Sequence, residues 1–427
     1  MLGIVLLIVG LLVSVALHEF GHLIPAKLFG VKVPQYFVGF GHTLFSRQIG
    51  GTEYGVKAIP LGGFVRLVGM YPPARTPDKP ARDGGESAVA EARRESLAEI
   101  APGEEHRAFY NLSVPRKIAV MLGGPLMNLA LAAVLMIVVF VGIGMPTHNS
   151  AQLGNVMACL PASYAPGEGA PSGQSPAPQC QPGELAGPAA LAGLQAGDKV
   201  ISWNGQSVTD WASVQAAIAA SPAGQSANVQ VERGGQLLTL AVTPALVSID
   251  GKQRAFVGVS PAVVYEPQSV GDALRATGEA TVATAGLIVR LPAFIANAAG
   301  ATLGLTERDP GGVMGLVGIG RAAGEVASAE GAGVDASARV AGFLTLLASL
   351  NLSLFVFNLL PILPLDGGHI LGALWEGARK TFRRVTGRGY AGPTDTARLL
   401  PLTTVVVYAL VGLMILLVVA DVVAPAF

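Results

Sequence analysis

Charged side chains are scarce in this chain. They make up 13% of its 427 residues, hydrophobic residues make up 51%, and the mean hydropathy is +0.53. These values exclude an ordinary soluble protein. The 28 basic and 28 acidic residues balance to a formal net charge of zero, so no global basic field points to nucleic acid. We therefore expect an integral membrane protein.

The beginning of the chain lacks charge altogether, since residues 1–17 read MLGIVLLIVGLLVSVAL. This segment also lacks the basic start and the small-residue cleavage site of a signal peptide, so we expect it to be retained as a transmembrane helix. Crossing the hydrocarbon takes about 20 apolar residues. We predict four such spans, at residues 2–24, 117–144, 341–363 and 400–424.

A fifth apolar stretch at residues 280–305 contains Arg290 and Pro292 in its middle. These residues favour one or two amphipathic helices that lie on the membrane or pack on a soluble domain. Lys and Arg are concentrated in the loop between the first two spans and in the loop between the last two, which places both loops in the cytoplasm. Both termini and residues 145–340 are then extracytoplasmic.

The first span ends in the motif HEFGH, which contains His18, Glu19 and His22. Residues four apart lie on one face of a helix, so both histidines can bind one ion while the glutamate polarises a water. The alternative is two ordinary histidines near a helix end. Ionisable groups in an apolar helix are expensive, which favours the functional interpretation.

A catalytic zinc ion usually takes three protein ligands and keeps one position for water. Asp366, in the motif PLDGG after the third span, is the best candidate for the third ligand, and His369 is its rival. The predicted topology brings this motif and HEFGH to one membrane depth, whereas a fifth span would separate them. The alternative role of Asp366 is that of a helix N-cap.

These motifs together resemble the site-2 protease family of intramembrane zinc metalloproteases. The likeness includes HEFGH, the run NLLPILPLDGG at 358–368 and GGPLMN at 123–128, and it covers nearly the whole chain. It implies zinc on His18, His22 and Asp366, Glu19 as the general base and Asn358 as a substrate-binding residue. It also implies that Pro361 and Pro364 break the helix near the site.

Residues 37–70 resemble the membrane-associated β-hairpin region of the bacterial branch that includes regulators of sigma-E protease type. This likeness implies cleavage of transmembrane segments of single-pass proteins, with anti-sigma factors as substrates, after a first cut by a site-1 type protease. The implied partners are these substrates, that protease and the lipid bilayer, with no nucleic acid. A zinc-binding membrane sensor or transporter without proteolytic activity is the alternative function.

Residues 187–208 resemble the core of a PDZ domain, which binds extended peptides by strand addition. The resemblance rests on a short alanine-rich helix, a Gly-Asp turn and an alternating strand that ends in Asn-Gly. The chain shows one clear copy, as in actinobacterial and Gram-positive members of the branch. A small β-domain without a ligand is the alternative.

The predicted fold is a polytopic α-helical membrane protein with four transmembrane helices, a membrane-associated β-hairpin region and an extracytoplasmic PDZ domain of the α+β class. Cys159 and Cys180, the only two cysteines, are expected either as an extracytoplasmic disulfide or as free thiols. The predicted segments are the first helix with HEFGH and the hairpin at 1–70, a flexible cytoplasmic linker at 71–115, the second helix at 116–145, the PDZ domain at 146–265, extracytoplasmic amphipathic helices at 266–338, the third helix with LDGG at 339–378, and a cytoplasmic loop with the fourth helix at 379–427.

Overall fold

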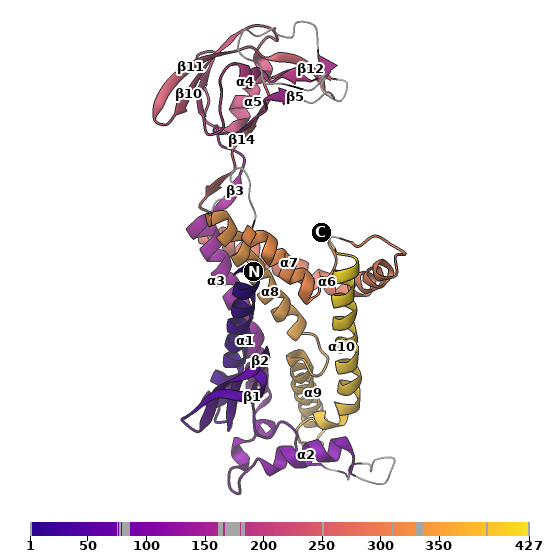
Figure 1. Cartoon of the computed structure of the whole chain (residues 1–427). Coiled ribbons are helices and arrows are strands. Elements are labelled where there is room, and N and C mark those ends of the chain that lie inside the picture. The colour runs from indigo at the N-terminus through magenta and orange to yellow at the C-terminus, as the bar shows by residue number, and fades with distance from the viewer. Residues whose placement is uncertain are drawn as a thin grey trace. The chain divides into compact units, whose positions relative to one another are not determined.

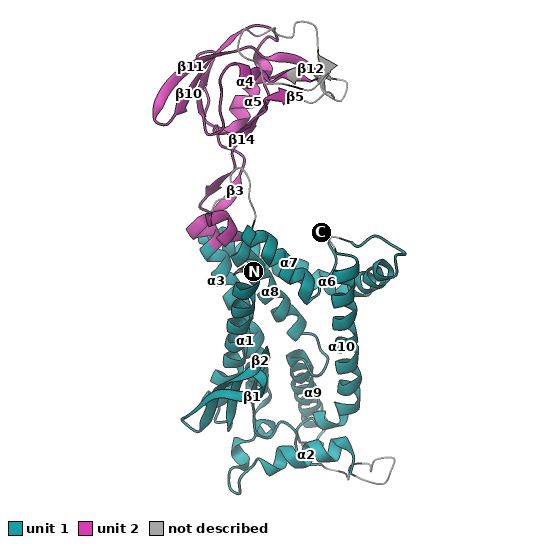
Figure 2. Cartoon of the chain, viewed as in Figure 1, with its two compact units in different colours: residues 1–138, 270–328, 342–427 teal, residues 139–269, 329–341 magenta. Residues whose placement is uncertain are grey.

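A computed structural model describes most of the chain, and its residues form two compact units (Figure 2). Unit 1 contains residues 1–138, 270–328 and 342–427, and unit 2 contains residues 139–269 and 329–341. The residues described are 2–74, 76, 78, 86–160, 165–166, 180, 184–249, 252–309, 311–328, 336–389 and 392–425.

Unit 1 is mainly helical (Figure 1). Its helices are α1 Leu2–Leu28, α2 Ala88–Ala98, α3 Val114–Ile137, α6 Val270–Thr302, α7 Leu316–Ser328, α8 Ala336–Asn358, α9 Asp366–Val385 and α10 Leu400–Val423. A π-helical turn, Val138–Ile143, extends α3. Short 3-10 helices occupy Glu105–Arg107, Phe109–Asn111 and Thr396–Leu399.

Five helices of the described residues are long and apolar enough to cross a membrane, namely α1, α3, α6, α8 and α10. Four of them match the predicted spans. The fifth, α6, is one continuous helix that passes through Pro292 without a break. Its Ala280 packs against a cluster that contains Ala132 of α3 and Leu352 of α8, and its Ala298 shares a cluster with Leu417 and Ala420 of α10.

The third predicted span ends earlier than expected. Helix α8 stops at Asn358 rather than at residue 363, because the segment that follows contains Pro361 and Pro364. Helix α9 then begins at Asp366. The polar motif therefore lies at a break between two helices, where one side chain can leave the helical hydrogen-bond pattern and face a neighbour.

A β-hairpin follows α1, as predicted, with strands β1 Gln35–Ile49 and β2 Thr52–Arg66. The hairpin is folded back on itself, since the first residues of β1 pair on one side with the start of β2 and on the other with its end. Gln35, for example, faces both Glu53 and Arg66. Residues 63–66 of β2 consequently form an edge of this small sheet.

The predicted flexible linker was wrong for residues 88–98, which form α2. Alanine-rich sequence favours a helix, and the Ser87 side chain caps it by accepting a hydrogen bond from the Ala90 amide. Arg93 of α2 is buried and forms ion pairs with Asp78 and with Asp395, next to the start of α10. The linker residues 75, 77 and 79–85 lie outside the described residues.

Unit 2 is a β-rich module with two short helices, α4 Pro188–Leu191 and α5 Trp211–Ala220. Its central sheet has the order β11-β10-β8-β9. Side chains along β10 are alternately buried and exposed, and the buried Val229 and Val231 lie in a core that also contains Trp203 and Val214. Its strands are β3 Met145–Thr147, β4 Leu153–Val156, β5 Cys159–Leu160, β6 Ala165–Pro166, β7 Leu185–Ala186, β8 Lys199–Trp203, β9 Gln206–Ser207, β10 Ala227–Arg233, β11 Gln236–Val242, β12 Ala245–Ile249, β13 Lys252–Phe256, β14 Val259–Pro261 and β15 Val264–Glu266.

Candidate active site

Two histidines project from α1 one helical turn apart. The Nε2 atoms of His18 and His22 lie 3.2 Å from each other. The Nδ1 atom of His22 lies 2.8 Å from the carbonyl oxygen of Val120 on α3. Because a carbonyl oxygen only accepts hydrogen bonds, this contact puts the ring proton on Nδ1 and leaves the Nε2 lone pair available to a metal ion.

Asp366, the first residue of α9, completes a triangle with these histidines. Its Oδ2 atom lies 3.4 Å from His18 Nε2, and its Oδ1 atom lies 3.4 Å from His22 Nε2. The alternative role as a helix cap was wrong, since Leu365 occupies the N-cap position of α9. The side chain of Asp366 faces α1 instead.

The imidazole nitrogens and the Asp366 carboxylate are spaced much as the ligands of a zinc ion are. Bonds of about 2.0–2.2 Å in a tetrahedral arrangement separate two ligand atoms by about 3.3–3.6 Å. The two Nε2 atoms lie 3.2 Å apart, and each lies 3.4 Å from a different carboxylate oxygen of Asp366, which is close to that range. Two imidazoles and a carboxylate are also a donor set that zinc accepts. These residues therefore fit a zinc ion with three protein ligands and one open position.

Glycine residues at the close contact between α1 and α3 leave room for this triangle. Gly21 of α1 faces Gly123 of α3, and a Cβ atom on Gly124 would lie 2.2 Å from His22 Nε2. A larger residue at position 124 would displace the imidazole ring. Sequence reasoning noticed GGPLMN only as part of a resemblance and missed this steric role, although adjacent glycines in an apolar helix often indicate close helix packing.

A cavity of about 300 Å³ opens beside the triangle. Glu19 lines it from α1, and Val65 of β2 lines it as well. The glutamate therefore lies beside the three possible ligand residues without belonging to their group. A carboxylate in this position can accept a proton from a water in the cavity.

Asn358 and His369 line the same cavity, at the end of α8 and on the first turn of α9. Neither belongs to the cluster of possible metal ligands found among the described residues. His369, the rival for the third ligand position, is thus a neighbour of the triangle. Two other histidines, His42 on β1 and His106 in a 3-10 helix, do not line the cavity.

The edge of the folded hairpin also borders the cavity, through Gly63, Phe64 and Val65. The hairpin is attached to α1 by the Tyr36 hydroxyl, which donates a 2.6 Å hydrogen bond to the Ala16 carbonyl oxygen. An exposed strand edge offers unpaired backbone groups to an extended peptide. The resemblance of residues 37–70 to a β-hairpin region did not indicate which segment would form the edge.

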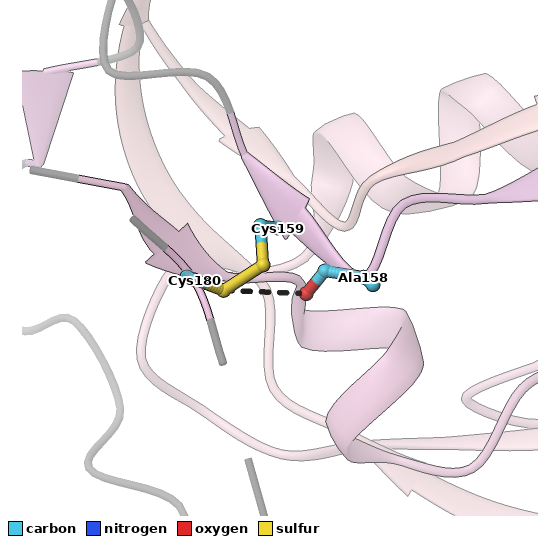
Figure 3. The surroundings of a disulfide bond; sticks show 3 residues. All are labelled: Ala158, Cys159 and Cys180. Atoms are coloured by element: carbon cyan, nitrogen blue, oxygen red, sulfur yellow. Dashed lines mark hydrogen bonds between the residues drawn. A yellow bond between two sulfur atoms is a disulfide. The ribbon is translucent and has the colours of Figure 1, made fainter. Parts of the chain in front are cut away.

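A second group of possible ligands, Cys159, Cys180 and Glu184, lies in unit 2. The two cysteines form a disulfide with Cα atoms 5.6 Å apart, and the Cys180 sulfur lies 3.9 Å from the Ala158 carbonyl oxygen (Figure 3). Disulfide sulfurs are not thiolates and do not bind zinc as such. Of the two states expected for these cysteines, the structure contains the disulfide.

Comparison with known proteins gives the family. Peptidase family M50 matches residues 6–400. The zinc metalloprotease Rip1 of Mycolicibacterium smegmatis is 34% identical over 446 aligned positions, which cover 99% of this chain and 98% of that protein. The chain belongs to peptidase family M50.

Other relatives of this M50 peptidase carry related names. The regulator of sigma-E protease RseP of Salmonella typhimurium is 26% identical, with 85% of this chain and 88% of that protein covered. The metalloprotease MmpA of Caulobacter vibrioides is 28% identical, with 89% of each covered. The family predicted from the HEFGH and LDGG motifs is therefore confirmed.

Proposed function

We propose that this M50 peptidase is a zinc-dependent intramembrane protease that cleaves transmembrane segments of single-pass membrane proteins. The observation that carries the proposal is the convergence of Asp366 with His18 and His22 beside Glu19. Both histidines and Glu19 lie on α1, a helix apolar enough to span a membrane. One relative is named a regulator of sigma-E protease, which supports a role in the control of a sigma factor. The substrates that we propose for such a role are membrane-anchored anti-sigma factors. Cleavage would follow a first cut by another protease, as in regulated intramembrane proteolysis.

The residues of the site divide the work of peptide hydrolysis. His18, His22 and Asp366 would hold the zinc ion, which when bound polarises the substrate carbonyl and makes its water more acidic. Glu19 takes a proton from the attacking water and returns it to the leaving nitrogen. The side-chain amide of Asn358 has one of two roles: it binds the substrate backbone, or it stabilises the negative charge that develops on the carbonyl oxygen.

The substrate must reach this site in an extended form, because a helix hides its carbonyl groups in hydrogen bonds. Residues 63–66 of β2 provide a strand edge that borders the cavity. A substrate segment that adds to this edge would expose its backbone beside Glu19. The hairpin thus serves as the template that keeps the unwound segment in place.

The proposed topology has four spans, with both termini outside and α6 lying along the extracytoplasmic surface. The basic residues in the last turns of α9 and just beyond it support this topology, namely Arg379, Lys380, Arg383, Arg384 and Arg388. Both α3 and α10 then run outward. Helix α6 begins against the outer half of α3 and ends against the last turns of α10, so its two ends lie on the same side.

Unit 2 is proposed to be a single extracytoplasmic PDZ domain. Residues 187–208 form the helix, turn and strand order that suggested it. A groove of about 260 Å³ lies between α5 and residues 254–259, where an extended peptide can add to the sheet. The disulfide supports an oxidising location. We favour size exclusion of untrimmed substrates as its role.

Accumulation of a trimmed anti-sigma factor tests the function in cells. In cells with a Glu19→Gln chain, we expect a membrane-anchored anti-sigma factor to persist as the fragment left by the first protease. The zinc sensor or transporter alternative requires no base, so its activity would survive this change. Normal turnover of the fragment in Glu19→Gln cells would exclude the proteolytic function.

A further inference from the structure

A buried ion pair joins α9 to α3 within unit 1. The Nζ atom of Lys117 lies 2.8 Å from the Oε2 atom of Glu376, and the two side chains are only 6% and 5% exposed. The Thr394 backbone amide donates a 3.0 Å hydrogen bond to the same Oε2 atom. A buried charge pair at an apolar helix is expensive to desolvate, so it calls for a reason other than stability.

Of the two helices that the pair connects, α9 carries one residue of the triangle and α3 contacts another. Helix α9 carries Asp366 at its first residue, and Glu376 lies about 15 Å further along the same helix at 1.5 Å per residue. Helix α3 holds the His22 ring through the Val120 carbonyl oxygen, one turn from Lys117. One short stretch of α3 therefore contacts a ligand from α1 and the helix that carries the ligand from α9.

Apolar contacts between α9 and α3 accompany the ion pair, since Ile370 of α9 packs against the cluster that contains Val120 and Met121 of α3. At the place where the helices meet, Gly377 faces Val114, and the large side chains of Leu374, Trp375 and Phe382 are 52%, 62% and 61% exposed on the opposite side. Smooth apolar contacts let helices slide, whereas an ion pair fixes one register. A slip of one residue moves α9 by about 1.5 Å, enough to spoil ligand separations of 3.4 Å.

We infer that the Lys117–Glu376 ion pair sets the register of α9 on α3 and thereby positions Asp366 for metal binding. Lys117 and Glu376 are positioning residues, since neither lines the catalytic cavity. The inference rests on the proposed function in one respect, namely that Asp366 is the third zinc ligand. It predicts that the pair affects zinc affinity more than its effect on stability would explain.

Zinc affinity of the purified full-length protein, measured by competition with a fluorescent chelator, tests this inference. Removing one partner in Lys117→Met should weaken zinc binding about 10-fold or more, as loss of supporting contacts around a metal site does. Lys117→Arg keeps the ion pair and should stay within about 3-fold of the unmodified chain. The double change Lys117→Met with Glu376→Met should recover the melting temperature, because it leaves no unpaired charge, but not the zinc affinity.

A matched control is available in the same unit. Arg308 and Asp421 form another buried ion pair, 3.3 Å apart with side chains 4% and 3% exposed, at the far end of α10. Arg308→Met should lower the melting temperature but leave zinc affinity within about 3-fold. An equal loss of zinc affinity in Arg308→Met and Lys117→Met, or normal affinity in the double Met variant, would overturn the inference.

A disulfide that locks the register gives a second readout, which does not depend on metal. A Cβ atom on Gly377 would lie 4.0 Å from the Val114 Cβ atom, within the range of about 3.5–4.5 Å found in disulfides. Val114→Cys with Gly377→Cys should therefore crosslink readily in the zinc-free protein, and the yield should fall several-fold when the double Met change is added.

Forming this disulfide by oxidation in a protein that also carries Lys117→Met should restore its zinc affinity. Equal crosslink yields with and without the ion pair would show that the pair does not set the register. If the Val114→Cys, Gly377→Cys protein crosslinks as expected but the unmodified chain binds no zinc, the proposed function fails, while the crosslink yields still decide the register claim.

Discussion

At the scale of single residues, the site depends on the small space that surrounds His22. Its ring lies between the Val120 carbonyl oxygen, which orients it, and Gly124, which leaves room for it. Sequence patterns predicted the histidines and Asp366 as ligands because their chemistry is distinctive. They did not predict the role of Gly124, since the need for a missing side chain appears only when two helices are placed together.

Gly124→Ala should therefore weaken zinc binding strongly, by about 10-fold or more, because the new methyl group would lie 2.2 Å from the coordinating nitrogen of His22. Isothermal titration of the purified, metal-free protein with zinc measures the effect. Gly412→Ala is the matched control, since a Cβ atom there meets nothing within 4 Å. Similar zinc affinity in the two variants would show that the α1–α3 contact does not shape the site.

In unit 2, the buried carboxylate of Asp198 is important for the stability of the fold. Arg233 donates to it through Nε and Nη2 at 2.6 and 2.7 Å, and the Gln195 amide donates at 2.9 Å. Burial alone would raise the pKa of Asp198, but these hydrogen bonds outweigh it and hold the pKa below its ordinary value. The stabilisation is thus present above the unfolded-state pKa of about 3.9 and is lost as the pH falls through the lower folded-state value.

Asp198→Asn should destabilise unit 2 by about 2 kcal/mol at neutral pH, since it removes the charge from these hydrogen bonds. Hydrogen exchange of the full chain should then be about 30-fold faster in β8 and β10. Glu232→Gln, at an exposed position of β10, is the control and should change little. Unchanged protection in Asp198→Asn would mean that the ion pair with Arg233 does not stabilise the module.

At the scale of elements, the orientation of α6 decides whether the chain crosses the membrane four or five times. Helix α6 leaves unit 2 at Val270 and ends at Thr302. If it lies along the outer surface, the residues after it stay outside. If it spans, they reach the cytoplasm.

Labelling of Leu305→Cys with a membrane-impermeant thiol reagent distinguishes these topologies. Leu305 is 74% exposed just beyond α6, so we expect labelling from outside in intact cells. Arg388→Cys, in the basic loop after α9, should react only after the membrane is permeabilised. Protection of Leu305→Cys in intact cells, with labelling after permeabilisation, would establish α6 as a fifth span.

The elements differ in how far the sequence predicts them. Apolar length was sufficient for α1, α3 and α10, and the hairpin was predicted from the resemblance of residues 37–70 to the hairpin region of the family. The register of the hairpin could not be predicted from the sequence, because Gln35 pairs with both Glu53 and Arg66 only when β2 bends around β1. It also missed α2, since the charges of that segment suggested a solvated linker, whereas Arg93 is buried in an ion-pair network.

At the scale of the whole molecule, unit 2 is a module that can be removed without cutting through unit 1. Strands β3 and β15 pair with each other where the chain enters and leaves the module, with Val264 opposite Thr147. The core of the module consists of its own residues. Its function can therefore be tested separately from that of the catalytic helices.

Replacing residues 149–262 by a short glycine-serine linker should leave cleavage of a pre-trimmed substrate largely intact. It should also permit some cleavage of the full-length substrate, because the module that excludes bulky outer domains is gone. Coexpression with both substrate lengths measures this, with Glu19→Gln as the inactive control. Loss of cleavage of the trimmed substrate, in a variant that still binds zinc, would instead indicate recruitment through the peptide groove.

The central claim is that one membrane-embedded triangle of ligands serves a protease whose base is Glu19. Zinc content and peptide-bond cleavage, measured side by side on purified protein, test it most directly. The unmodified chain should bind zinc and cleave a transmembrane substrate, and Asp366→Ala should lose both properties. Glu19→Gln should keep its zinc and lose cleavage by a factor of about 10²–10⁴, as expected for removal of a general base. Near-normal cleavage by Glu19→Gln, or full zinc content in Asp366→Ala, would contradict the account.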